Sequence, residues 1–86
     1  MKTVKRYSHF HHFESIRKVK KAGATIRKRR EALGLSQEGL AEGASTHRNY
    51  IGAVERGESS PSIFVLANIA EALGLKTSEL LKEAGF

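Results

Sequence analysis

Apolar residues recur every three or four positions along most of the chain, in short blocks that polar turns separate. This spacing places the apolar side chains of each block on one face of an α-helix. The sequence has a single proline and no long segment rich in β-branched residues, so an all-α fold is predicted. We expect five helices, at about residues 24–33, 37–43, 47–54, 61–73 and 78–84.

The residues that flank these blocks are typical of helix ends. Gly34 and Gly74 each follow a leucine at the end of a block, where glycine accepts the left-handed backbone of a helix C-terminus. Ser36 is placed to cap the helix at 37–43, and Ser60 precedes Pro61, a residue suited to the first helical position. These caps support the division into separate helices.

Residues 1–22 are specified more weakly than the rest of the chain. Apolar residues recur there every three positions, which is compatible with a helix of two or three turns from Ser8. The charge of the segment is equally compatible with a mobile arm. We therefore divide the chain into a basic N-terminal arm or short helix, residues 1–22, and a folded domain, residues 23–86.

Charge is distributed unevenly along the chain. Residues 1–30 carry eleven Lys or Arg against Glu14 alone, a net charge of +10, whereas residues 31–86 carry four against eight Glu, a net charge of −4. Such asymmetry indicates a polyanionic partner for the basic part. Nucleic acid is the first expectation, and an anionic membrane surface or a merely solubilising tail are the alternatives.

Composition argues against several classes of protein. The chain has no cysteine, so neither a disulfide nor a thiolate metal site is predicted. No apolar run approaches the roughly 18 residues of a membrane span, and no apolar segment of a secretory signal follows the basic start, so a cytoplasmic protein is expected.

A chain of 86 residues builds only a small core, for which dimerisation is a common remedy.

Residues 37–54 have the spacing of two helices packed across a tight turn. Positions are counted here from Gln37. The fifth position is small, as required where one helix crosses the other. The fourth, eighth, fifteenth and eighteenth positions are apolar and are expected to face a shared core. The ninth position lies in the turn, where glycine is usual because the backbone is left-handed. Here it is Ser45, which costs about 1 kcal/mol of stability if the backbone keeps that conformation. The residues that fit the spacing are Leu40, Ala41, Ala44, Ile51 and Val54.

The motifs GLSQE-LA, YI---ERG and L--IA-ALG occur together in this chain. With them, residues 23–82 resemble the helix-turn-helix family of phage Cro and repressor proteins, to which restriction-modification controller proteins and several antitoxins also belong. The resemblance implies a five-helix domain in a bacterial or phage-type protein, with the third helix entering the major groove of double-stranded DNA.

The resemblance also implies roles for residues of the second and third helices. Gln37 matches a position that hydrogen-bonds a DNA phosphate, and Arg48 and Asn49 match positions at the exposed start of the recognition helix. Their chemistry agrees, because Arg pairs with guanine and Asn with adenine through two hydrogen bonds each. The expected base-reading residues are Arg48, Asn49, His47 and Ala53, and the expected phosphate contacts are Gln37, Thr46, Tyr50, Arg56 and Ser59. The alternatives are an ordinary solvated helix start and, for Tyr50, packing.

Two further sets of residues concern the architecture. In related domains the positions that match Arg30 and Glu55 form an ion pair that orients the recognition helix, so the resemblance implies a structural role for Glu55 rather than a catalytic one. Near the C-terminus, three apolar residues exceed what so small a core can use. They are the expected homodimer interface: Leu80, Leu81 and Phe86.

No arrangement of residues is typical of catalysis or of metal binding. His9, His11 and His12 lack a helical i, i+4 pair, and neither cysteine nor clustered acid joins them, so an aromatic, basic arm is expected there rather than a metal site. No nucleophile motif, carboxylate pair or glycine-rich phosphate loop is present. We expect no enzymatic activity, no cofactor and no small-molecule ligand.

The predicted function is that of a sequence-specific transcriptional regulator that binds a pseudo-palindromic DNA operator as a homodimer, with half-sites about 34 Å apart. The alternative is an antitoxin-type module that sequesters a toxin through its N-terminal segment and binds DNA for autoregulation. A toxin or a polymerase is therefore the protein partner under consideration. An RNA-binding or coactivator role is a third, weaker option.

Overall fold

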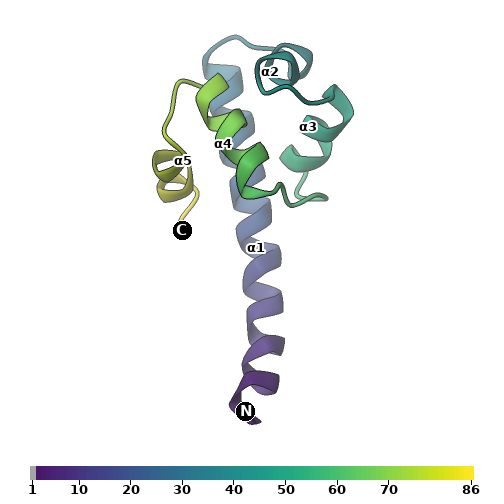
Figure 1. Ribbon diagram of the computed structural model, residues 1–86, viewed down its shortest axis with the longest axis vertical. Coiled ribbons are helices and arrows are strands. Elements are labelled where there is room, and N and C mark those ends of the chain that lie inside the picture. Colours follow the sequence, from purple (N-terminus) through teal and green to yellow (C-terminus); the bar gives the residue numbers. More distant parts are fainter. Residues whose placement is uncertain (1) are drawn as a thin grey trace.

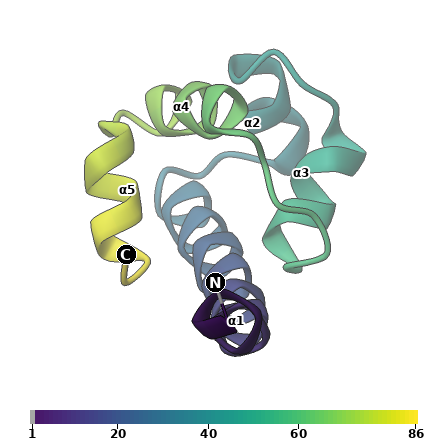
Figure 2. The same ribbon diagram turned by 60° about the horizontal axis from the view of Figure 1, so that its bottom comes forward.

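The computed structural model describes residues 2–86, and their side chains from residue 15 onward. The described residues form five helices and no strand: α1 (Lys2–Ala32), α2 (Gln37–Gly43), α3 (Arg48–Glu55), α4 (Ile63–Ala72) and α5 (Thr77–Glu83). The four short helices gather around the C-terminal half of α1 (Figure 1). Seen from below, α5, α4, α2 and α3 form an arc around it (Figure 2). The predicted all-α, five-helix fold is confirmed.

The short helices lie close to their predicted positions. The bounds of α2 are those expected, and α3 and α5 are each displaced by about one residue. The start of α4 was predicted wrongly: Ser62 caps this helix, since its Oγ accepts from the backbone N–H of Val65 at 3.2 Å, so Pro61 precedes the helix. Three other helix ends are as expected: Ser36 Oγ accepts from Gly39 N–H at 2.9 Å, and Gly34 and Gly74 have left-handed φ angles of 71° and 74°.

Helix α1 differs most from the prediction because it begins at Lys2 and runs without interruption through residues 22 and 23. Gly23, inside this helix, marks a close approach of two elements rather than a helix end. A Cβ atom at Gly23 would lie 2.1 Å from the carbonyl oxygen of Val54 and 2.8 Å from that of Glu55. The backbones of α1 and α3 are therefore in contact, which sets the position of α3 in the fold.

The core consists of aliphatic side chains from all five helices. Leu40, Ala44, Ile51 and Val54, expected in the core, are buried, and Ile26, Leu66 and Ile69 pack with them. Leu80 is a correction. It was expected at a dimer interface, but it is 0% exposed within one chain, because α5 packs against α1 and α4 and turns this side chain inward.

A surface ion pair fastens α5 to α1. Arg29 donates from Nε to both carboxylate oxygens of Glu83 at 3.0 Å, and also from Nη2 to Oε2. The hydrogen bonds and the positive charge of Arg29 hold the pKa of Glu83 below its ordinary value. This contact closes the arc of helices at its C-terminal end.

Two kinds of feature are absent from the described residues. No helix has the length and apolar composition needed to cross a membrane. No group of three or more His, Cys, Asp or Glu side chains is arranged to hold a metal ion. The side chains of His9, His11 and His12 lie outside the described part of the chain.

Candidate nucleic-acid interface

Helices α2 and α3 pack against each other across a four-residue turn, residues 44–47. Ala41, where the two helices cross, is only 3% exposed, and its carbonyl oxygen accepts from the N–H of Thr46 at 2.9 Å. Ser45 has a φ angle of +56°, the left-handed conformation usual for glycine at this position. The turn thus keeps its geometry at a cost of about 1 kcal/mol.

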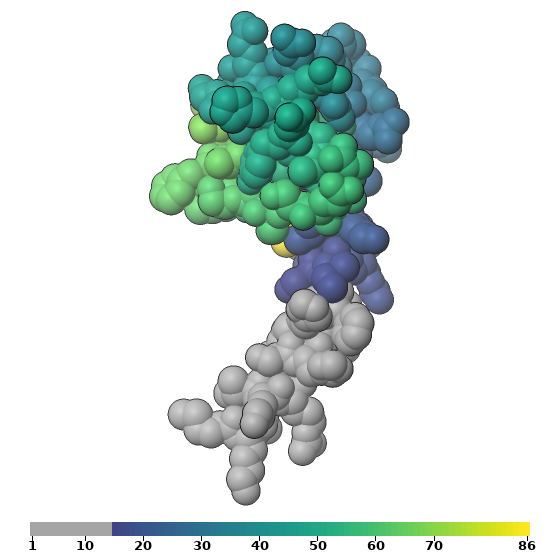
Figure 3. Space-filling model, turned by 90° about the vertical axis from the view of Figure 1, so that its right-hand side faces the viewer, coloured from purple at the N-terminus to yellow at the C-terminus, as the bar shows by residue number. Residues whose placement is uncertain are grey.

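Three of the expected base-reading residues stand together at the start of α3. The side chains of His47, Arg48 and Asn49 are exposed, and His47 is the N-cap residue but makes no capping hydrogen bond through its side chain. No hydrogen bond or ion pair joins these three side chains to other described residues. Figure 3 shows the side of the molecule that carries α3.

Several of the other candidate contacts are less exposed. Ala53, Thr46 and Ser59 are half-buried. Tyr50 is also half-buried and packs against the core, so its ring has a structural role whatever its hydroxyl contacts. Exposed candidates therefore lie at the first turn of α3 and, with Arg56, just past its end.

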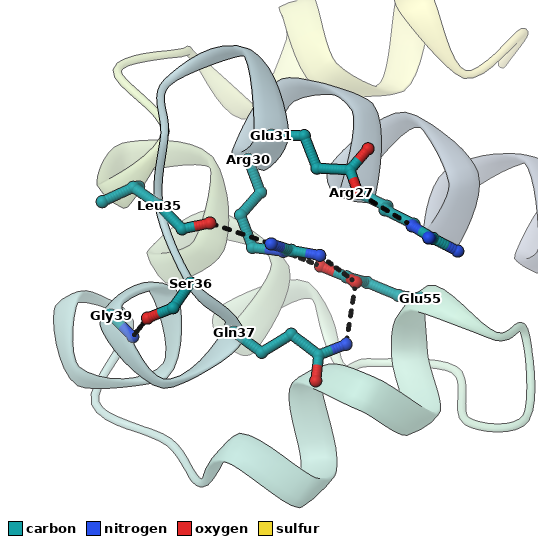
Figure 4. A network of polar contacts seen from close by, with 8 residues as sticks. All are labelled: Arg27, Arg30, Glu31, Leu35, Ser36, Gln37, Gly39 and Glu55. Carbon is teal, nitrogen blue, oxygen red and sulfur yellow. Dashed lines mark hydrogen bonds and ion pairs between the residues drawn. The ribbon is translucent and has the colours of Figure 1, made fainter.

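A buried polar network joins α1, α2 and α3 (Figure 4). Arg30 donates from Nε to Oε2 of Glu55 at 2.7 Å and from Nη2 to Oε1 at 3.0 Å, and its Nη1 donates to the carbonyl oxygen of Leu35 at 2.8 Å. The side chains of Arg30 and Glu55 are 11% and 2% exposed. The hydrogen bonds that Arg30 donates to Glu55 raise the pKa of Arg30 against the opposing effect of burial.

Gln37 belongs to the same network, a link that sequence reasoning missed. Its Nε2 donates to Oε1 of Glu55 at 3.1 Å (Figure 4). The two residues are eighteen positions apart, and no local pattern in the sequence connects them. The residue expected to contact a phosphate is therefore held in place by the carboxylate that also binds Arg30.

Arg56 has an unforeseen partner in the free protein. Its Nε donates to Oε2 of Glu58 at 3.0 Å, and its Nη2 donates to Oε1 at 3.1 Å. Both side chains are exposed. The hydrogen bonds and the opposite charge raise the pKa of Arg56 and lower that of Glu58. Arg56, a candidate phosphate contact, thus already forms an ion pair with a carboxylate of its own chain.

The two remaining dimer candidates border an apolar groove beside α1. Leu81 is half-buried, and Phe86 is 54% exposed, with the ammonium of Lys18 5.2 Å from the centre of its ring. The groove has a volume of about 300 Å³. Its apolar lining also includes residues that sequence reasoning did not associate with an interface: Val19, Ala22, Pro61, Ile63 and Leu66.

The packed pair of α2 and α3, with the exposed start of α3, defines a helix-turn-helix unit. Residues 26–80 match the model of the helix-turn-helix family HTH_3, and the chain belongs to this family. It is a transcription regulator of a class that acts by binding DNA.

Several characterised relatives share this domain. The chain is 42% identical over 60 residues to the control protein C.SmaI of Serratia marcescens, covering 70% of this chain and 71% of that protein. It is 36% identical over 61 residues to the immunity repressor protein of Bacillus phage phi105, covering 71% and 42% of the two chains. The structure of the restriction-modification controller protein C.AhdI from Aeromonas hydrophila is similar, with a TM-score of 0.70 and 40% identity over 72% of this chain and 94% of that one.

Proposed function

We propose that this protein is a sequence-specific regulator that binds double-stranded DNA with α3 in the major groove. The observation that supports this most directly is the exposed trio His47, Arg48 and Asn49 at the start of α3, whose side chains have no partner among the described residues. Arg48 suits a guanine and Asn49 an adenine, and the methyl group of Ala53 suits the methyl group of a thymine. Gln37, Thr46, Tyr50, Arg56 and Ser59 surround this trio as phosphate contacts.

The proposed regulator acts as a homodimer on an operator with two half-sites. Support comes from the apolar groove that Leu81 and Phe86 border, whose lining also includes Ile63, 58% exposed. Large apolar side chains gathered at one place on a small domain are typical of an association surface. Such a homodimer would present its two α3 helices to half-sites about 34 Å apart, one turn of DNA.

Selection of bound duplexes from a random pool tests the proposal. The expected result is one enriched sequence with two inverted half-sites whose centres lie about 10 base pairs apart. Enrichment of a single, asymmetric half-site would contradict the dimer but not the base reading. Failure to enrich any sequence, from protein shown to be folded by its helical circular dichroism, would overturn the proposed function.

A further inference from the structure

The surroundings of Gly52 explain why a poor helix former lies in the middle of α3. Gly52 is buried, and a Cβ atom at this position would lie 3.0 Å from Nη1 of Arg56 and 3.7 Å from Oε1 of Gln37. The space of the missing side chain is thus occupied by the guanidinium of Arg56. Arg56 lies across the helix backbone next to the amide of Gln37, because Gly52 leaves room for it.

Two polar side chains therefore approach the same position of α3. Gln37 turns its amide oxygen Oε1 toward Gly52, while its Nε2 donates one of its two N–H groups to Glu55. Arg56 directs Nε and Nη2 to Glu58, while its Nη1 lies over Gly52. Gln37 comes from the start of α2 and Arg56 from the end of α3, so the contact between the helices brings them together.

We propose that Arg56, placed over Gly52 and next to Gln37, binds a DNA phosphate, and that Glu58 is an internal anion with which this phosphate competes. The inference rests on the proposed function and specifies one of its contacts. A carboxylate and a phosphate bind a guanidinium through the same pair of parallel hydrogen bonds. The side chains of Arg56 and Glu58 are both exposed. An exposed ion pair is weak, so a DNA phosphate can replace the carboxylate.

The competition has a direct consequence for binding. Glu58 neutralises Arg56 in the free protein, so part of the attraction between Arg56 and DNA is lost when the carboxylate is displaced. Removing the negative charge of Glu58 should raise the affinity for any duplex, because phosphate contacts are independent of sequence. Glu58 would thus limit non-specific binding by a chain whose net charge is +6.

The first experiment measures the affinity of the full chain for a 30-base-pair duplex of random sequence. Glu58→Gln should bind roughly two- to fivefold more tightly than the wild type. Glu71→Gln is the matched control, since it removes the same charge from an exposed carboxylate on α4. Equal gains for the two variants would show a general effect of net charge and would overturn the proposal.

A double-mutant comparison tests whether Glu58 affects DNA affinity through its pair with Arg56. Arg56→Ala should weaken binding and lower the slope of log K against log salt concentration by about 0.9, one phosphate contact. In the Arg56→Ala background, Glu58→Gln should no longer raise the affinity. A gain that persists without Arg56 would contradict the competition.

A third variant tests whether the space at Gly52 holds the guanidinium of Arg56 in place for binding. Gly52→Ala should displace the guanidinium and lower the affinity roughly two- to fivefold, while thermal stability is unchanged or higher because alanine favours the helix. Gly43→Ala is the control, because its added Cβ would meet the Cβ of Ala72 at 3.2 Å and no polar group. Wild-type affinity in a folded Gly52→Ala variant would overturn the role of Gly52.

The outcomes distinguish this inference from the proposed function. If the wild-type chain selects an operator but Glu58→Gln and Glu71→Gln behave alike, the phosphate site fails and the regulator function stands. If the folded wild-type chain binds neither the random duplex nor any selected sequence, both fail together.

Discussion

Gln37 donates a hydrogen bond from Nε2 to Oε1 of Glu55, at 3.1 Å. The same carboxylate accepts two hydrogen bonds from Arg30, so α1, α2 and α3 meet at one buried acidic group. Glu55 therefore does more than close an ion pair. It links α1 to α3, and it accepts a hydrogen bond from a side chain of α2 that we propose contacts DNA.

Removing Glu55 should destabilise the fold severely. Glu55→Ala strands Arg30, whose side chain is only 11% exposed, and leaves Gln37 without its acceptor. Loss of one partner of a buried pair costs about 3–5 kcal/mol in the free energy of unfolding. Urea denaturation measures this loss.

A surface pair provides the control for this measurement. Glu31→Ala breaks the i, i+4 ion pair with Arg27. The side chains of Arg27 and Glu31 are 64% and 56% exposed, so the loss should lower the free energy of unfolding by less than about 1 kcal/mol. If Glu55→Ala were no more destabilising than Glu31→Ala, the network would contribute little to the fold.

The sequence predicted the parts of this fold that depend on local spacing. Leu40, Ala41, Ile51 and Val54 follow from the packing of two helices across a short turn, because the turn leaves few alternative arrangements. The length of α1 did not follow, because residues 1–22 are weakly specified by local spacing and the role of Gly23 is a contact with the backbone of α3. That contact depends on tertiary structure.

The same reason accounts for what was missed in the candidate site. Gln37 and Glu55 are distant in sequence, and their hydrogen bond exists only once α2 and α3 have packed. Leu80 and Leu81 are adjacent leucines that the sequence does not distinguish. Their difference follows from which face of α5 packs against the core.

Arg48 should contribute to sequence preference. Arg48→Ala is expected to lower affinity for the selected operator more than for random DNA, by about 1–3 kcal/mol of lost discrimination. Arg48→Lys is the matched control, because it keeps the charge but loses the planar pair of donors. Competition binding with both duplexes measures the difference. Equal losses on operator and random DNA for Arg48→Ala would refute base reading by this residue.

The pair of Arg29 and Glu83 should make stability depend on acidic pH. Because the pKa of Glu83 is lowered in the folded state, the pair stabilises the protein above the ordinary value of 4.5 and loses its effect as the pH falls through the lower, folded pKa. The difference in free energy of unfolding between the wild type and Glu83→Gln should be constant near neutral pH and shrink below 4.5. A difference independent of pH would show that this carboxylate does not titrate with folding.

The basic N-terminal segment should contribute to the salt dependence of DNA binding. The sequence alone suggests deletion of residues 1–21, but Val19 and Ala22 border the apolar groove, so the truncation should end at residue 14. Each lost phosphate contact lowers the slope of log K against log salt concentration by about 0.9. A slope equal to that of the full chain would show that residues 1–14 contact no phosphate.

Replacing Phe86 should weaken dimerisation without affecting the fold. Because Phe86 is 54% exposed at the groove, Phe86→Ser should raise the dimer dissociation constant in sedimentation experiments and leave the free energy of unfolding of the monomer nearly unchanged. Leu33→Ser, at another exposed apolar residue on the surface, should leave the dimer intact. Leu80→Ala should instead cost about 2–5 kcal/mol of stability, as expected of a fully buried leucine. If Phe86→Ser and Leu33→Ser associated equally well, the interface would lie elsewhere.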